Sequence, residues 1–153
     1  MSYKFKIITV IAIIGLVVLT IALNYVSSEL YSLKYRNPIR KIYLGNVIVK
    51  AEVVSSKEKI EAGLSGRSNL SEGRGMFFVM PQEDFQRFWM KGMQFPIDII
   101  WIENDRVIGC EEWILPEDQR IFTSPGKVGF VLEVSAGFCE KNQVQVNDII
   151  RIR

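Results

Sequence analysis

The chain has 153 residues, with 19 lysines and arginines against 17 aspartates and glutamates, and it contains no histidine. This length allows one domain and little more, and the nearly balanced charge argues against nucleic acid as a partner. The lack of histidine excludes Ser-His-Asp and Cys-His nucleophile systems and His-ligated zinc. Two cysteines are too few for a four-thiolate zinc site, so we expect no metal and no cofactor.

The first predicted element is a single membrane-spanning helix. No charged residue occurs between Ile7 and Ser28, and a helix from Ile7 to Val26 would be about 30 Å long, which matches the hydrocarbon core of a bilayer. Lys4 and Lys6 precede it and favour a cytoplasmic N-terminus, with the following domain on the extracytoplasmic side. The alternatives are a cleaved signal peptide, whose apolar part is usually shorter, and a core helix, which would show a polar face.

Residues 29–41 are predicted to be a connector between this anchor, residues 1–28, and a domain over residues 42–153. Four basic residues in this region oppose the proposed orientation and are candidates for contact with anionic lipid: Lys34, Arg36, Arg40 and Lys41. A solvated linker is the plainer interpretation of the same residues.

Within the domain, the pattern predicts mainly β-structure. Apolar and polar residues alternate from Val47 to Val54, which is typical of a half-buried strand, and Ser55 to Leu64 has the capping pattern of a short helix. Ser135–Asn142 is predicted to form a helical turn or two. Apolar or aromatic runs bounded by turn residues predict further strands at Met76–Met80, Phe85–Met90, Ile97–Glu103, Arg106–Leu115, Lys127–Val134 and Asp148–Ile152. Short strands at this spacing indicate an antiparallel sandwich or barrel.

Several motifs resemble those of the DUF192 (UPF0127) family. They occur in the family's order, and they include Gly63-Leu64, Gly75-Met76-Phe77-Phe78, Phe88-Trp89-Met90-Lys91, Pro96-Ile97-Asp98-Ile99-Ile100 and Val131-Leu132-Glu133-Val134. The resemblance implies a compact antiparallel β-sandwich of jelly-roll type with two short helices. It also implies a prokaryotic protein, often preceded by a signal or a membrane anchor, and it implies no particular reaction.

Two positions depart from the family's pattern. Lys91 is followed by Gly92-Met93 where the family usually has Asn-Thr, so a ligand held by that amide and hydroxyl would lose both groups. Asn147-Asp148 stands where the family tends to have Gly-Asp. Because asparagine tolerates a positive φ, we expect the same turn there.

The candidate ligand-binding residues are Arg67, Trp89, Lys91, Asp98 and Glu133. Lys91 and Asp98 flank a turn at Pro96, so two paired strands can bring the ammonium and the carboxylate together beside Trp89, to bind a sugar or a peptide. The alternative is a structural ion pair. Arg67 is suited either to hold a carboxylate or phosphate or to brace its own loop.

Glu133 and the two cysteines leave alternatives open. An inward carboxyl at Glu133 would carry a raised pKa and would be a candidate acid or base, but we expect a partnered or rim side chain, on the same strand face as Val131. Cys110 and Cys139 either form a disulfide or remain two buried thiols. Carboxylate pairs for hydrolysis can be drawn from Asp98, Glu111, Glu112 and Glu133.

The sequence therefore predicts a membrane-tethered, extracytoplasmic domain that acts as a binding or accessory module of the cell envelope. Its partners would be the membrane and an envelope ligand or protein. Two alternatives remain, a histidine-free hydrolase of envelope polymers that uses a carboxylate pair, and a structural envelope protein.

Overall fold

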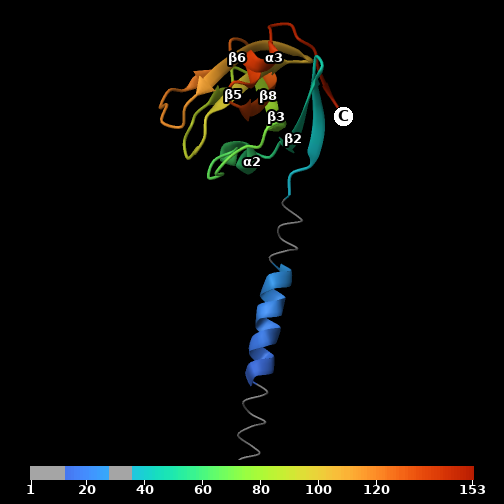
Figure 1. Cartoon of the computed structure of the whole chain (residues 1–153), viewed down its shortest axis with the longest axis vertical. Helices are drawn as coiled ribbons and strands as arrows, with labels where there is room; N and C mark the ends of the chain where they lie inside the picture. The colour runs from blue at the N-terminus through green and yellow to red at the C-terminus, as the bar shows by residue number, and fades with distance from the viewer. Residues whose placement is uncertain (1–12, 28–35) are drawn as a thin grey trace, which may run out of the picture. The chain divides into compact units, whose positions relative to one another are not determined.

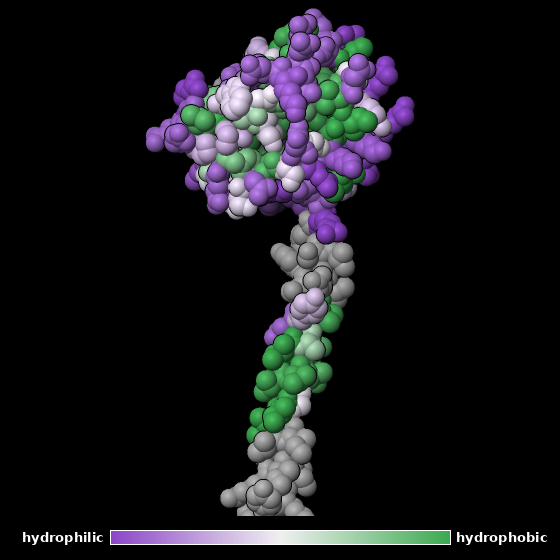
Figure 2. Space-filling model, viewed as in Figure 1, coloured by the Kyte–Doolittle hydropathy of each residue, from purple (hydrophilic) through white to green (hydrophobic). Residues whose placement is uncertain are grey.

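The computed structural model describes residues 13–27 and 36–153 and divides the chain into two units, Met1–Arg36 and Asn37–Arg153. In the first unit, residues 13–27 are helical, and the large apolar side chains of this helix are 50% to 67% exposed. The visible surface of this helix is mostly hydrophobic, with hydrophilic residues toward its C-terminal end (Figure 2). Within the described ranges no helix is both long enough and apolar enough to cross a bilayer. The expected span, Ile7 to Val26, begins among residues outside these ranges.

The second unit is built on one curled sheet of seven strands (Figure 1). In spatial order the strands are β6 Arg106–Ile114, β5 Ile97–Glu103, β8 Val128–Ser135, β3 Arg74–Asp84, β2 Val47–Val54, β1 Ile39–Leu44 and β9 Ile150–Ile152. A small second sheet pairs β4 Arg87–Phe88 with β7 Phe122–Thr123, and two short helices complete the unit, α2 Lys57–Ala62 and α3 Phe138–Asn142.

The main sheet is a half-barrel. Of the two expected architectures, an antiparallel sandwich or an antiparallel barrel, it is closer to the barrel, but it is not purely antiparallel. β2 and β3 run parallel, because α2 and the loop after it return the chain to the end of the sheet where β2 began. The two edge strands also meet at one end, where the Asn147 N–H donates to the Val107 carbonyl at 2.8 Å and the Val107 N–H donates to the Asp148 carbonyl at 3.0 Å. Because the sheet curls this far, its own strands enclose the inner core, and no second layer is needed on that face.

The prediction of a mainly β domain is confirmed, and β2 and β5 have the predicted bounds. Two strands, β1 and β7, were not predicted. β1 begins at Ile39, so the end of the expected connector, residues 29–41, belongs to the sheet, and residues 28–35 lie outside the described ranges. β3 continues past the predicted end at Met80, through Pro81, to Asp84. The strand tolerates Pro81 because its pairing with β8 is interrupted between Val79 and Asp84, so the missing N–H of the proline removes no hydrogen bond from the sheet. Asn147 has the expected positive φ, 78°.

Two apolar cores lie on the two faces of this sheet. The inner face is filled mainly by Ile42, Leu44, Val49, Ala51, Phe77, Ile100, Ile102, Leu132, Val134 and Ile150. On the outer face, β3, β5 and β8 are covered by α2, β4, β7 and the loops beside them. Phe88 packs edge-on against Phe78 and Trp101 there, with ring centroids 5.1 and 5.6 Å apart. The outer face of β1, β2 and β9 carries mostly exposed residues.

Gly75 tests the packing at the centre of the sheet. A Cβ at Gly75 would lie 2.8 Å from the Glu133 carbonyl oxygen and 2.9 Å from the Val49 side chain, whereas a Cβ at Gly129 of β8 would meet nothing within 4 Å. We predict that Gly75→Ala lowers the free energy of unfolding by about 1–3 kcal/mol through overpacking. Gly129→Ala should change it by less than about 0.5 kcal/mol. Urea unfolding of the full chain in detergent measures both, and equal losses would contradict the assigned packing of β3 against β2 and β8.

Candidate functional site

A pocket of about 190 Å³ opens on the outer face of the sheet, between α2 with its following turn and the loop after β4. Its apolar walls are Ile60, Leu64, Phe78, Met80, Phe88 and Met93. Its polar and amphipathic lining comprises Glu61, Ser65, Arg87, Trp89, Lys91 and Glu133. The pocket thus combines an apolar interior with a few polar groups, the usual composition of a small-molecule site.

Two turns fasten the walls of this pocket to each other. The Ser65 hydroxyl donates to the Lys91 carbonyl at 2.8 Å, and the Gly66 N–H donates to the Gly92 carbonyl at 2.9 Å. Gly92 has a φ of 75°, and a Cβ there would lie 2.1 Å from the Ser65 hydroxyl oxygen. Glycine at position 92, where the chain departs from the family's usual pattern, therefore has a structural reason, since Ser65 occupies the space that a larger side chain needs.

The carboxyl group of Glu133 is buried at the base of the pocket. Glu133 is 5% exposed, and its Oε2 atom has no hydrogen-bond partner among the described residues. Met76 of β3 and Ile99 of β5 lie directly opposite it on the two neighbouring strands. Burial raises the pKa of Glu133 to about 8, and the charge of Arg67 opposes this in part. At neutral pH the group is therefore mostly protonated, able to donate a hydrogen bond as well as to accept one.

The expectation of a partnered or rim Glu133 is thus wrong, although the predicted alternation is right. Val131 belongs to the outer core with Glu133, and Leu132 and Val134 belong to the inner one. The outer face at this strand is covered rather than solvated, which the local sequence does not reveal.

Arg67 binds a carboxylate of the protein itself. Its guanidinium donates to both carboxylate oxygens of Glu52, at 2.5 and 2.9 Å, and the Asn37 amide donates to the same carboxylate at 2.9 Å. The hydrogen bond from Arg67 holds the pKa of Glu52 below its usual value. The bidentate geometry expected of Arg67 is present, but its partner is internal and not a ligand.

Trp89 and Lys91 lie on the rim of the Glu133 pocket, and Trp89 is 51% exposed. Asp98 is elsewhere. It is fully buried and lies opposite Val134 on the inner side of the sheet. The expected pair of Lys91 and Asp98 is therefore not formed, because successive residues of β5 point to opposite faces.

Asp98 fixes the junction between β6 and α3. Its Oδ1 atom accepts the N–H groups of Trp113 at 2.8 Å and Gly137 at 3.1 Å, and its Oδ2 atom accepts that of Cys139 at 2.9 Å. Trp113 has a φ of 55°, a conformation unfavourable for a large side chain. Its N–H bond to Asp98 helps to hold that conformation, so the role of Asp98 is structural.

A disulfide between Cys110 of β6 and Cys139 of α3 lies beside this carboxylate. Of the two alternatives that the sequence left open, the structure contains the disulfide and not two free thiols. The carboxylate of Asp98 and the two sulfurs lie within 4.8 Å of one another. Metal binding requires thiolates, however, and bridged sulfurs are not thiolates, so these three residues do not form a metal site while the bridge is intact.

Part of the pocket was not predicted from the sequence, and some of the predicted carboxylates lie outside it. Ser65, Arg87 and Met93 were not predicted, since turns and a two-residue strand contribute them. The only sequence feature that pointed to Ser65 was the pair of closely spaced glycines, Gly63 and Gly66, on either side of it. Asp98, Glu111 and Glu112 do not line the pocket among the described residues, and the other carboxylate at its edge is the exposed Glu61.

The family profile of DUF192, described as an uncharacterised ACR, matches residues 41–152. The chain belongs to the DUF192 family. A protein of unknown function from Novosphingobium aromaticivorans matches with a TM-score of 0.70 and 24% identity, over 75% of this chain and 84% of that protein. A putative transcription regulator from Sinorhizobium meliloti matches with a TM-score of 0.72 and 22% identity, over 76% of this chain and 95% of that protein. Both likenesses show the fold alone. No curated protein matches the chain significantly.

The titration of Glu133 makes the stability of this DUF192 domain depend on pH. Because burial raises its pKa from 4.5 to about 8, its contribution to stability is full below pH 4.5 and falls as the pH rises to about 8, by a few kcal/mol in all. Glu133→Gln removes this titration. We predict that the variant and the wild type unfold alike near pH 4.5 and that the variant is the more stable at pH 8, in urea unfolding of the full chain in detergent.

The exposed Glu103 provides the control for this comparison, because Glu103→Gln removes a carboxyl of the same type from the surface. A difference between Glu133→Gln and wild type that stays constant from pH 4.5 to 8 would contradict a buried, unpartnered carboxyl.

Asp98→Asn would place an amide NH₂ group against a backbone N–H. We predict a loss of about 3 kcal/mol in the free energy of unfolding, because hydrogen bonds to a carboxylate are lost and a donor is left unpaired. Asp148→Asn is the matched control, since the Asp148 side chain accepts one N–H, from Gln145 at 2.8 Å on the surface. It should cost about 1 kcal/mol or less. Equal losses, measured by chemical unfolding of the full chain, would contradict the structural role of Asp98.

Proposed function

We propose that this DUF192 domain is a binding module for a small organic ligand. The observation that carries the proposal is the unpartnered Oε2 atom of Glu133 at the base of an open, apolar pocket. A buried polar atom without a partner costs about 1–3 kcal/mol. A ligand that hydrogen-bonds to Glu133 offsets this cost and gains affinity from it.

The lining of the pocket defines the chemistry of the ligand. The neutral carboxyl of Glu133 favours a hydroxyl or amide at the buried end, and the apolar walls favour a ring or a short acyl chain. The basic side chains of Arg87 and Lys91 favour an anionic group at the open end, where Trp89 offers an exposed indole face. A small aromatic or aliphatic acid with a polar tip fits all three features.

The proposal also includes a membrane anchor formed by the N-terminal apolar segment. The helix over residues 13–27 exposes apolar side chains on every side, and the uncharged run extends in the sequence from Ile7 to Ser28. A mostly apolar helix without charged residues is favourable in lipid, where it satisfies its own backbone hydrogen bonds. The hydroxyls of Thr20 and Ser27 also donate to carbonyls of this helix.

Two observations support a domain on the extracytoplasmic side of that membrane. Lys4 and Lys6 precede the apolar run and favour an N-terminus that stays inside. The disulfide between Cys110 and Cys139 is of a kind that persists mainly in oxidising compartments.

The three tryptophans allow a direct test of binding by fluorine NMR on the full chain labelled with 5-fluorotryptophan, in zwitterionic nanodiscs. Trp89 is on the pocket rim, Trp101 is buried in the outer core, and Trp113 hydrogen-bonds to Glu140 of α3. The probe is 4-hydroxyphenylacetate, which carries a phenol suited to hydrogen-bond to Glu133 and a carboxylate suited to pair with Lys91. We predict a saturable shift of the Trp89 resonance alone, with a Kd on the order of 1 mM.

Two comparisons make this test specific. Phenylacetate lacks the hydroxyl and should bind about fivefold more weakly, the equivalent of one hydrogen bond. Lys91→Gln should weaken both probes, whereas Lys127→Gln, on an exposed lysine outside the pocket, should weaken neither. Equal shifts at all three tryptophans, or no saturable shift at Trp89, would overturn the proposal.

A further inference from the structure

Four basic residues lie side by side across four adjacent chain segments of the main sheet. Lys41 of β1 pairs with Lys50 of β2, which pairs with Arg74 of β3. On the other side, Lys41 exchanges two backbone hydrogen bonds with Arg153, each 2.9 Å long, directly after β9. Residues opposite each other on neighbouring strands share a face, and neighbouring strands lie about 4.8 Å apart, so these four residues, the cationic row, span about 14 Å.

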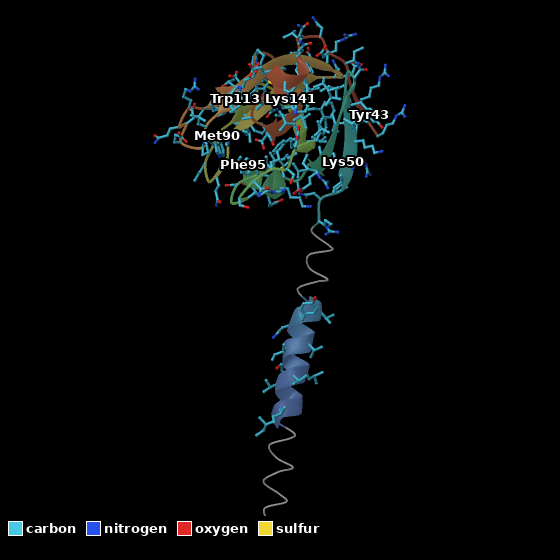
Figure 3. The ribbon with its side chains drawn as sticks, in the orientation of Figure 1. Tyr43, Lys50, Met90, Phe95, Trp113 and Lys141 are labelled. Atoms are coloured by element: carbon cyan, nitrogen blue, oxygen red, sulfur yellow. A yellow bond between two sulfur atoms is a disulfide. The ribbon has the colours of Figure 1, made fainter. Side chains whose placement is uncertain are left out.

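The cationic row lies on the outer face of the sheet. The residues next to Lys41 and Lys50 along the strands, Ile42, Val49 and Ala51, are buried in the inner core. All four basic residues are exposed. Tyr43 and Lys50 can be located on the β1–β2 ribbon in Figure 3, and a surface groove there is bordered by Tyr43, Lys41, Lys50 and Arg153.

Within residues 13–27 and 36–153, no ion pair balances the charge of this row. The salt bridges among the described residues are formed by other basic side chains. Glu52, the carboxylate on the same face of β2, feels the charge of Arg74 but is already bound by Arg67 and Asn37. Like charges placed directly opposite on neighbouring strands repel each other. A row of this kind is favourable when an anionic partner lies against it.

Apolar side chains accompany the cations on this face. Ile39 is 50% and Ile48 46% exposed, and the Arg153 guanidinium lies 5.6 Å from the Tyr43 ring centroid. Basic side chains mixed with exposed aliphatic and aromatic ones are typical of surfaces that enter the lipid head-group region. β1 begins 12 positions after residue 27 (39 − 27), a length of chain that spans at most about 40 Å.

We propose that the cationic row, with Ile39, Tyr43 and Ile48, docks the domain onto anionic phospholipid head groups of the membrane that holds its N-terminal helix. This docking rests on the anchoring proposed above. It would hold β1, β2 and β9 against the bilayer.

The test uses the full chain in lipid nanodiscs and separates anchoring from docking. Co-elution with discs of phosphatidylcholine alone reports anchoring, and its failure would overturn both proposals. In discs that do retain the chain, the rates at which acetic anhydride acylates each lysine are compared between phosphatidylcholine and a mixture with phosphatidylglycerol. Acylation of Lys41 and Lys50 should be about fivefold slower in the mixture, since a basic side chain near an anionic surface gains about 1 kcal/mol. High salt should abolish the difference.

Lys57 and Lys127 are internal references, because neither belongs to the row and both are exposed. Equal slowing of all four lysines, or equal rates of Lys41 and Lys50 in the two kinds of disc, would overturn docking while leaving anchoring in place. Soluble polyphosphate added to phosphatidylcholine discs provides a further arm. Protection by polyphosphate without protection by phosphatidylglycerol would overturn the lipid assignment in favour of a soluble polyanion.

Neutralising the arginines of the row keeps both lysines as reporters. In the Arg74→Gln/Arg153→Gln variant, Lys41 and Lys50 should lose most of their protection by phosphatidylglycerol. In the matched variant Arg106→Gln/Arg120→Gln, which removes two exposed arginines outside the row, protection should remain. Equal protection in the two variants would overturn the proposal.

Discussion

The interior position of β8 in the main sheet determines where the polar group of the pocket lies. β8 is hydrogen-bonded to β3 on one side and to β5 on the other, and cores cover both of its faces. Every residue from Val131 to Val134 is buried. A polar side chain in this stretch therefore cannot reach water at a sheet edge, because a strand lies on each side of β8. Leu132 and Val134 fill the inner face, and Glu133 must face the outer one. There the turns after α2 and β4 enclose a pocket around it, and this places a neutral carboxyl at the base of an apolar site.

The same outer face serves two different purposes along its width. Over β5, β8 and β3 it is covered and contains the pocket, whereas over β2, β1 and β9 it is open and basic. Arg67 neutralises the carboxylate of Glu52, which lies on the same face of β2 as Lys50 and feels the charge of Arg74. On the inner side, Asp98 and the disulfide fasten β6 to α3. Glu133 differs from these side chains, because it is buried and its Oε2 atom has no partner among the described residues.

Local sequence patterns predicted the elements whose residues have clear periodicity, such as β2, and the apolar run of β5. They left a sandwich and a barrel open, and they did not predict the parallel pair of β2 and β3 or the meeting of the two sheet edges, because both depend on contacts between distant segments. Trp89, Lys91 and Glu133, three of the candidate ligand-binding residues, line one pocket, and their role in binding stays a prediction. Asp98 was wrongly joined to them because β5 is buried on both faces and is apolar on either side of Asp98, so its sequence does not show which face Asp98 takes. The disulfide could not be predicted, because the sequence separation of Cys110 and Cys139 does not determine the distance between them in the fold.

The protonation state of Glu133 is measured most directly by carbon NMR of its side-chain carboxyl. The full chain would carry ¹³C-labelled glutamate, with the resonance assigned by Glu133→Gln, and would be titrated from pH 3 to pH 10. A buried, unpartnered carboxyl predicts a midpoint near pH 8. A midpoint near 4.5, the ordinary value for a glutamate, would show that the group is solvated or paired, and would contradict the pocket described above.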